Sequence, residues 1–345
     1  MKTKLIVIGI LSLCSVGFYT IKSDFFKYPK YFPVPEYDFT KNPISKNKII
    51  LGNALFYDPI LSKDNTISCA SCHSPYNAFA HTDHKVSHGI QDQIGTRNAP
   101  ALFNLAWQKS FMWDGAIKHL DMQALAPISD ATEMGENIQH VVHKLKQSNI
   151  YPKLFQAAYG DRNITGERIL KALSQFQLSL ISANSKYDKV IQGKEKFTNQ
   201  ENTGYSIFKN KCNSCHAEPM FTNYGFANNG IAVDTIFNDY GRWMVTKQSK
   251  DSLAFKIPTL RNLRFSPPYM HDGRFKKLNQ VLNHYTSEKN QSKTLAAELK
   301  KPLQLTANEK VDLIAFLRTL NDEDFIFDPK NKFPRNILLT TKTKN

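Results

Sequence analysis

The chain contains the pattern Cys-x-x-Cys-His twice, first in SCASCHSP and again in KCNSCHAEP. Two thiols two residues apart, followed at once by an imidazole, are typical of c-type haem attachment, in which the histidine ligates the iron. Two disulfides, or zinc held by paired Cys-x-x-Cys units, would also use four cysteines, but neither needs a histidine after each pair. The pattern therefore predicts two covalently bound c-type haems, attached through Cys69, Cys72 and His73 and through Cys212, Cys215 and His216.

The first twenty residues, MKTKLIVIGILSLCSVGFYT, place two lysines before an apolar run from Leu5 to Phe18. This order is typical of an export signal, and the run is too short to be assigned as a membrane span. Residues 1–20 are therefore predicted to be a signal peptide or an N-terminal anchor. Cleavage, lipidation at Cys14 and retention as a membrane anchor all stay open, because the residues around Gly17 and Leu13 fit their consensus patterns poorly.

The charge balance is strongly basic, with 45 Lys plus Arg against 30 Asp plus Glu and a formal net charge of +15. A positive surface attracts acidic partners, although an ordinary solvated basic surface gives the same count. The lysines are scattered and no nucleic-acid-binding motif accompanies them, so no nucleic-acid partner is expected.

Helical signals precede and follow each attachment motif. Residues 45–58 and 197–211 are predicted to be helices that lead into the two motifs, the second with a Thr198-x-x-Glu201 capping box and Tyr205 and Phe208 on one face. Residues 165–182 and 305–320 are predicted to close the two domains, the latter with a second capping box at Thr306 and an apolar stripe at Val311, Ile314, Ala315 and Leu317.

Period-2 strand patterns are scarce in the chain. The predicted fold is therefore mostly α: two cytochrome-c-like haem domains packed together, with long loops and little strand. We expect the first domain at residues 45–185 and the second at 195–330, with residues 183–196 as the linker.

Several long motifs resemble the bacterial dihaem cytochrome c peroxidase family, which includes the MauG-like enzymes. The resemblance runs from about Leu51 to Leu320 and rests on DNTISCASCHSPYNAF, GTRNAPALFNLAW, FMWDG, QALAPISDATEM, KIPTLRNL and PPYMHDGRF. It implies a periplasmic protein with two haems, of which the N-terminal one reacts with peroxide and the C-terminal one stores or relays electrons. It also implies a calcium ion between the domains.

The resemblance assigns roles to four residues on the peroxide side. Trp113, in FMWDG, falls where the family places a tryptophan between the two haems, and it would relay electrons. Gln123, Pro127 and Glu133 would lie above the peroxidatic iron. Glu133 would act as the acid/base if burial raises its pKa, Gln123 would hydrogen-bond the ligand, and Pro127 would shape the pocket.

The sequence offers more than one candidate for each of the remaining iron ligands. Some members hold a histidine above the first haem, for which His81, His84 and His88 are available and His88 lies closest to the expected position; MauG-like members keep that site open. The position 14 residues after His271 is methionine in the peroxidases and tyrosine in MauG-like members, and here it is Tyr285.

Met270 is the rival ligand of the second iron, because methionine ligation is common in cytochromes c. The choice affects the chemistry, since an anionic oxygen ligand favours the ferric state and a thioether raises the potential. For calcium, the resemblance implies the side chain of Asn98 and the backbone carbonyls of Ser266 and Pro268; oxygen ligands suit this hard cation.

Together these features predict a periplasmic dihaem peroxidase that reduces hydrogen peroxide with electrons from a small redox protein such as a cytochrome or cupredoxin. A MauG-like oxidase that acts on a protein or small substrate is the first alternative. A non-catalytic dihaem electron carrier is the second, although it would need neither Glu133 nor Gln123. The sequence leaves the donor, any protein substrate and a homodimeric state undetermined.

Overall fold

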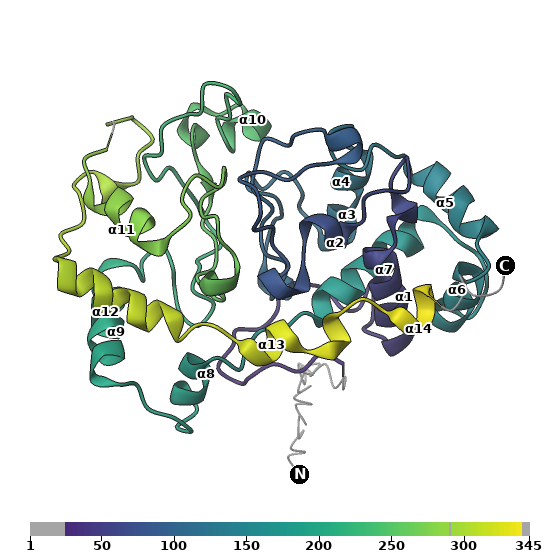
Figure 1. The fold of residues 1–345 in the computed structure, drawn as a ribbon, viewed down its shortest axis with the longest axis horizontal. Helices are drawn as coiled ribbons and strands as arrows, with labels where there is room; N and C mark the ends of the chain where they lie inside the picture. Colours follow the sequence, from purple (N-terminus) through teal and green to yellow (C-terminus); the bar gives the residue numbers. More distant parts are fainter. Residues whose placement is uncertain (1–24, 290, 340–345) are drawn as a thin grey trace, which may run out of the picture.

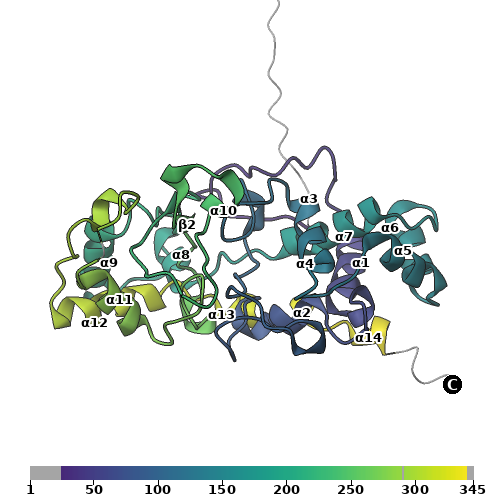
Figure 2. The ribbon, with the colours of Figure 1, turned by 90° about the horizontal axis from the view of Figure 1, so that it is seen from above.

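The computed structural model describes residues 25–289 and 291–339, and this part of the chain is mostly helical. It forms two lobes that lie side by side and are joined by long loops (Figure 1), and the view from above shows an elongated molecule (Figure 2). The sheet of the described residues is one antiparallel pair of two-residue strands, β1 (Phe226–Ala227) and β2 (Phe255–Lys256). The predicted fold class is confirmed.

The helices of the N-terminal lobe are α1 (Lys46–Tyr57), α2 (Cys69–Cys72), α3 (Leu120–Gln123), α4 (Leu125–Ser129), α5 (Ile138–Gln147), α6 (Tyr151–Tyr159) and α7 (Gly166–Ser179). A connecting helix follows, α8 (Lys186–Ile191). The C-terminal lobe contains α9 (Asn199–Lys211), α10 (Trp243–Thr246), α11 (Leu278–Thr286) and α12 (Ala307–Arg318). The chain ends with α13 (Glu323–Phe327) and α14 (Arg335–Leu338).

Short 3-10 helices lie in the loops of both lobes. They are η1 (Pro59–Leu61), η2 (Pro75–Asn77), η3 (Ile90–Asp92), η4 (Leu105–Trp107), η5 (Ser249–Asp251), η6 (Leu263–Phe265), η7 (Ala297–Leu299) and η8 (Pro329–Asn331).

Each lobe is built on one close helix crossing, α1 with α7 in the first and α9 with α12 in the second. A glycine lies at each crossing: a Cβ atom on Gly52 would lie 1.9 Å from the carbonyl oxygen of Ala172, and one on Gly204 would lie 1.9 Å from that of Asp312. The absence of a side chain lets the two backbones touch. The two lobes therefore share the same kind of helix pair, which crosses at a glycine, and each lobe contains its own Cys-x-x-Cys-His motif.

The predicted helix boundaries and caps are confirmed at α9 and α12, whose capping boxes at Thr198 and Thr306 are both formed. The stacked Tyr205 and Phe316 rings lie 5.0 Å apart, so the predicted face of α9 does contact α12. The predicted apolar stripe of α12 is partly wrong. Val311 is 55% exposed, and the buried residues are Leu313, Phe316 and Leu317, because the close crossing at Gly204 turns that face toward α9.

The core of the N-terminal lobe includes both ends of the described chain. Phe26 and Phe32 pack around Trp107, whose indole N–H donates to the carbonyl oxygen of Pro33 at 2.7 Å. The C-terminal tail returns along the lower side in Figure 1 and buries Phe325 in the same core. The division into haem domains at residues 45–185 and 195–330 stays a prediction, with residues 25–44 and the tail added to the packing of the first lobe.

The segment expected to be a linker, residues 183–196, contains α8, and its Asp188 is fully buried. The Asp188 carboxylate pairs with the Arg261 guanidinium through two hydrogen bonds of 2.9 and 2.8 Å and accepts a third from the Tyr31 hydroxyl at 2.7 Å. The segment thus links residues 25–44, the N-terminal strap, to the C-terminal lobe.

The predicted signal or anchor at residues 1–20 lies outside the described residues. Within residues 25–289 and 291–339, none of the helices combines the length and apolar character that a membrane crossing needs.

Candidate active site

The first Cys-x-x-Cys-His motif forms the short helix α2, which opens with a capping box between Ser68 and Ser71. His73 follows the helix, and its backbone N–H donates to the carbonyl oxygen of Cys69 at 2.9 Å. Its Nδ1 atom lies 2.7 Å from the carbonyl oxygen of Phe79, which can only accept, so Nδ1 carries the proton. Removal from water lowers the pKa of His73 to about 4. The imidazole is neutral, with Nε2 available as a donor to a metal.

The second motif repeats this arrangement at the C-terminal end of α9. The His216 backbone N–H donates to the carbonyl oxygen of Cys212 at 2.9 Å, and Nδ1 lies 3.1 Å from the carbonyl oxygen of Pro258. Burial lowers the pKa of His216 to about 4 as well. The two histidines therefore present the same nitrogen from equivalent positions in the two lobes.

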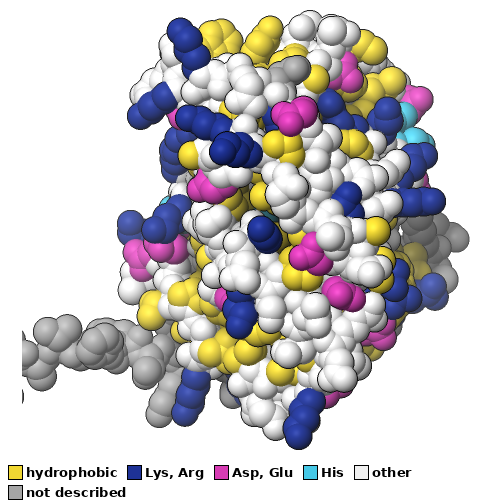
Figure 3. All heavy atoms as spheres, turned by 90° about the vertical axis from the view of Figure 1, so that its left-hand side faces the viewer, with side chains coloured by type: hydrophobic (Ala, Val, Ile, Leu, Met, Phe, Trp, Pro, Cys, Tyr) yellow, Lys and Arg dark blue, Asp and Glu magenta, His cyan; other side chains and the backbone are white. Residues whose placement is uncertain are grey.

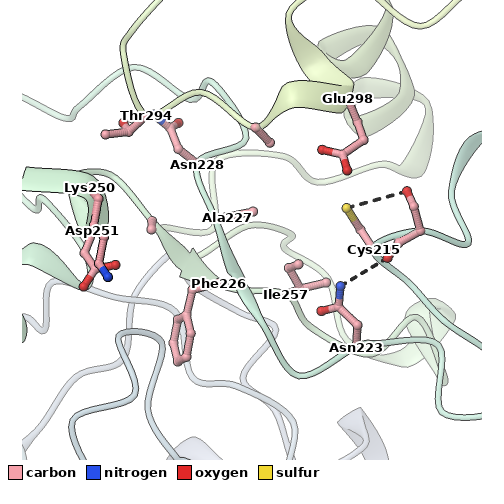
Figure 4. Close-up of a pocket in the computed structure, with 13 residues that line it drawn as sticks. Cys215, Asn223, Phe226, Ala227, Asn228, Lys250, Asp251, Ile257, Thr294 and Glu298 are labelled. Atoms are coloured by element: carbon pink, nitrogen blue, oxygen red, sulfur yellow. Dashed lines mark hydrogen bonds between the residues drawn. The ribbon is translucent and has the colours of Figure 1, made fainter.

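The residues at both motifs fit c-type haem. All four cysteines are free thiols, and among the described residues no group of three His, Cys, Asp or Glu side chains could hold a metal ion by itself. Neither disulfides nor a zinc site are formed by this chain's described part. A cavity of about 300 Å³ opens beside Cys215 and is lined by Phe226 and Ile257 among others (Figure 4).

Glu133 lies beside the first motif. Burial raises the pKa of Glu133 to about 7, with a smaller contribution from Asp130. The pKa values of the Cys69 and Cys72 thiols, raised chiefly by burial to about 12 and about 11, are also raised by the negative charge of Glu133. The structure therefore brings the predicted acid/base to the predicted attachment site, in the protonation range expected of it.

The loop that carries Glu133 is held from two sides. The carbonyl oxygen of Glu133 accepts the backbone N–H of Ile90 at 2.7 Å. The neighbouring Met134 donates its backbone N–H to the carbonyl oxygen of Pro127 at 3.2 Å. A Cβ atom on Gly89 would lie 2.4 Å from the Glu133 carbonyl oxygen, so only glycine allows this approach. Gly89 was not predicted as a site residue, although its position directly after His88 in VSHG could have indicated it.

Gln123 lies at the end of α3, where its side chain meets two others. Its Oε1 atom accepts a hydrogen bond from Gln177 Nε2 at 3.4 Å, and its Nε2 atom lies 3.9 Å from Met112 Sδ. The Oε1 atom of Gln177 is buried and has no hydrogen-bond partner among the described residues. Gln177 was missed by the sequence reasoning, because a glutamine on the buried face of a helix resembles an ordinary core position.

Trp113 lies where the two lobes meet. Its indole N–H donates to the carbonyl oxygen of Asn98 at 2.8 Å, and its carbonyl oxygen accepts the backbone N–H of Lys256 from β2 at 2.7 Å. Lys256 was not predicted. Its ammonium group donates to the carbonyl oxygen of Ser110, and burial lowers the pKa of Lys256 to about 7. Trp113 is thus held by hydrogen bonds from both lobes.

The three histidines considered as distal ligands form a row. His81 Nε2 lies 3.2 Å from His84 Nδ1, and the rings of His84 and His88 are 4.7 Å apart. His88 Nδ1 is paired with Asp92 at 2.6 Å, while its carbonyl oxygen accepts from the Cys72 thiol at 3.7 Å. The loop therefore lies against the first motif, and the assignment of His88 to an iron stays a prediction.

Tyr285 lies beside the second motif, and Met270 was the rival ligand. The pKa of the Tyr285 phenol is raised to about 12, chiefly by burial, with further contributions from Cys212 and Cys215. Met270 has a positive φ of 79°, and its sulfur accepts from Asn229 Nδ2 at 3.5 Å. The choice of ligand between Tyr285 and Met270 stays a prediction.

One of the residues expected around calcium, Asn98, is hydrogen-bonded to the segment that follows the other two. The Asn98 backbone N–H donates to the carbonyl oxygen of His271 at 2.7 Å, which ties Asn98 to the loop that contains Ser266 and Pro268. The Asn98 side-chain amide donates to the carbonyl oxygen of Lys85 at 3.1 Å, which leaves its Oδ1 atom as the potential ligand. The calcium site stays a prediction.

Comparison with known proteins gives consistent matches. Residues 46–196 match the family model described as di-haem cytochrome c peroxidase. The chain is 35% identical over 310 residues to the methylamine utilization protein MauG of Methylorubrum extorquens, covering 86% of this chain and 84% of that protein. It is 33% identical to the cytochrome c551 peroxidase of Nitrosomonas europaea, covering 81% of this chain and 83% of that protein.

Among solved structures, a MauG-like protein associated with microbial copper homeostasis aligns with a TM-score of 0.81 and 31% identity, covering 90% of this chain and 99% of that one. The diheme peroxidase BthA from Burkholderia thailandensis aligns with a TM-score of 0.72 at 20% identity over 85% of this chain and 91% of that one, which is a likeness of fold.

Proposed function

This chain belongs to the family of dihaem cytochrome c peroxidases and MauG, and we propose that it reduces hydrogen peroxide to water with electrons from a small redox protein. Two c-type haems follow from the family, with Cys69, Cys72 and His73 and then Cys212, Cys215 and His216 as their attachment residues. The haem held by His73 would supply the iron chemistry toward peroxide.

The observation that carries the proposal is the half-buried Glu133 carboxyl beside the first motif, with its pKa raised to about 7. Conversion of peroxide to two waters consumes two electrons and two protons, so a group is needed that moves protons at the bond being broken. With a pKa near neutrality, Glu133 can take a proton from one peroxide oxygen and return it to the other. Gln123 would hold the peroxide by its amide, and Pro127 would limit the space around it.

Electrons would enter through the C-terminal lobe and cross at Trp113. Its hydrogen bonds to Asn98 in one lobe and Lys256 in the other hold the indole at the junction. Fixed geometry keeps the transfer distance constant, which a relay between two separate cofactors requires.

The electron donor is proposed to be acidic, because the chain carries a formal charge of +15. Lys and Arg side chains spread across the outer face of the C-terminal lobe (Figure 3). If charge steers the donor, its association rate constant should fall as the salt concentration is raised. Screening shortens the distance over which surface charges act to about 8 Å at 0.15 M salt. Stopped-flow oxidation of a reduced acidic cupredoxin measures this. A rate constant independent of ionic strength would indicate an apolar docking surface instead.

A second candidate function is a MauG-like oxidase, which would use peroxide to oxidise a protein or a small substrate. The presence of Tyr285 beside Cys212 and Cys215 of the second motif favours it, because an anionic oxygen ligand there would stabilise ferric and higher oxidation states at the second iron. Both candidates share the peroxide chemistry at Glu133 and differ in where the two electrons originate.

We propose a periplasmic location, on the export-signal pattern of residues 1–20, and a calcium ion at Asn98, Ser266 and Pro268.

Peroxide turnover by the purified dihaem protein tests the proposal, measured with and without a reduced acidic cupredoxin. A dihaem peroxidase consumes peroxide at a rate set by the donor. An oxidase shows slow turnover with the donor but oxidises an added protein or phenolic substrate. No peroxide consumption under either condition would contradict both functions and leave the non-catalytic electron carrier.

A further inference from the structure

We propose that Arg97 is a positioning residue for electron transfer, which fixes the place of Trp113 between the two Cys-x-x-Cys-His motifs. This inference rests on the proposed route through Trp113. Arg97 lies in TRNAP, directly before Asn98, and had no role in the sequence reasoning.

The Arg97 guanidinium joins the two lobes through three short hydrogen bonds. Its Nε and Nη2 atoms donate to the two carboxylate oxygens of Asp239, in the C-terminal lobe, at 2.6 and 2.9 Å. Its Nη1 atom donates to Asp114 Oδ2, in the N-terminal lobe, at 2.6 Å. The guanidinium is planar and its donors have a fixed geometry, so this one group sets the separation of the two carboxylates.

Asp114 directly follows Trp113, and the two residues are held by two consecutive residues of TRNAP. The Trp113 indole N–H donates to the carbonyl oxygen of Asn98 at 2.8 Å, and the next residue, Asp114, accepts from Arg97. The other oxygen of the Asp114 carboxylate accepts the backbone N–H of Ala116 at 2.9 Å, so the carboxylate is also fixed within its own loop. A displacement of Arg97 would therefore move the backbone that carries the indole.

The C-terminal lobe holds its side of this contact equally firmly. Asp239 Oδ1 accepts the backbone N–H of Gly241 at 2.9 Å, which fixes the carboxylate that pairs with Arg97. Arg242, just before α10 at the boundary with the N-terminal lobe (Figure 1), donates through Nη1 to the carbonyl oxygen of Asp114 at 2.9 Å. The lobes are thus joined in both directions at the residue next to Trp113.

The burial of these charges favours a geometric role. Only 21% of the Arg97 side chain is exposed, with 11% of Asp114 and 10% of Asp239. Charges removed from water gain little net stability from pairing, whereas their directional hydrogen bonds specify one arrangement of the groups around them. Electron transfer depends on that arrangement, because its rate falls steeply as the distance between donor and acceptor grows.

The test uses the dihaem protein labelled with fluorotryptophan. Two quantities are measured: the fluorine NMR resonance of Trp113, assigned with Trp113→Phe, and the rate of electron transfer between the haems after flash photoreduction without peroxide. Arg97→Lys keeps the charge but loses the two-bond geometry, and Asp239→Asn removes the charge that ties Arg97 to the C-terminal lobe. In both variants we expect the Trp113 resonance to shift and broaden, and the transfer rate to fall by at least about 10-fold.

The matched control is Arg168→Lys, since Arg168 pairs with Asp161 through two hydrogen bonds of 2.5 and 3.0 Å within the N-terminal lobe. It should leave both quantities unchanged. Trp107, in the core of that lobe, is the internal reference, and its resonance should stay in place in every variant.

A wild-type Trp113 resonance and transfer rate in both Arg97→Lys and Asp239→Asn would overturn the proposal. A shift of the Trp107 resonance together with that of Trp113 would also overturn it, because Arg97 would then support the fold as a whole. Wild-type transfer in Trp113→Phe would contradict the relay and the inference with it. Failure of peroxide turnover would contradict the proposed function alone, because neither readout uses peroxide.

Discussion

At the scale of single residues, the site depends on polar groups that the fold removes from water. Glu133 and Lys256 have ordinary pKa values far apart, yet burial brings the pKa of each to about 7. Glu133 lies beside the first motif and Lys256 beside Trp113. Both can therefore change protonation state near neutral pH.

The raised pKa of Glu133 predicts the pH dependence of the reaction with peroxide. A base must be ionised to take a proton, so kcat/KM for peroxide should rise as pH rises through about 7 and level off above it. Steady-state rates measured between pH 5 and 9 would cover roughly two pH units on either side of this pKa. Glu133→Gln should flatten the profile. The same inflection in that variant would assign it to another group.

The sequence predicted the attachment residues and the spacing from Trp113 to Glu133 because these lie in contiguous motifs. It could not predict residues whose roles come from neighbours far along the chain. Asn229, for example, contacts Met270 across 41 residues of sequence. Other unpredicted residues at the site are Gly89, Arg97, Gln177 and Lys256.

At the scale of elements, the two lobes depend on paired helices that cross at a glycine. Capping boxes and amphipathic periodicity were sufficient to predict α7, α9 and α12. They did not predict which face of α12 is buried, because Gly204 lets α9 approach more closely than an average helix pair does. The helix α8 was missed because it is only six residues long and its buried Asp188 pairs with Arg261, which is distant in the chain.

The glycine crossing gives a stability prediction. Gly204→Ala would place a methyl group against the backbone of α12, and overpacking of this kind costs typically about 1–3 kcal/mol. We expect a lower apparent melting temperature by circular dichroism, even though alanine is the better helix former. Ser206→Ala, on the exposed face of α9, is the control and should not lower it. Equal melting temperatures for the two variants would show that α12 moves away at no cost.

At the scale of the whole molecule, the buried pair of Asp188 and Arg261 joins three separate parts of the chain. Asp188 lies on the connecting helix, Arg261 in the C-terminal lobe, and Tyr31 in the N-terminal strap. Burial acts to raise the pKa of Asp188, but Arg261 and the hydrogen bonds outweigh it and lower that pKa. The stability that this carboxylate contributes is therefore present above its unfolded pKa and lost as pH falls through the folded value.

Asp188→Asn should destabilise the protein by about 3–5 kcal/mol, because it leaves the Arg261 guanidinium buried without a counter-charge. Denaturant unfolding followed by fluorescence measures the change. The control is Glu323→Gln, which breaks the exposed pair with Arg264 and should cost less than about 1 kcal/mol. Similar losses in the two variants would mean that the buried pair is not what joins the lobes.

The most direct test of the proposed function is peroxide reduction by Glu133→Gln beside the wild-type dihaem protein. Glutamine keeps the size of the side chain and cannot move the proton, so we predict both haems attached, a nearly normal spectrum and kcat/KM for peroxide lower by at least about 100-fold. Glu167→Gln, an exposed acid of the same lobe, is the control and should match the wild type. Wild-type peroxide turnover in Glu133→Gln would contradict the assignment of Glu133 as the proton-transferring group.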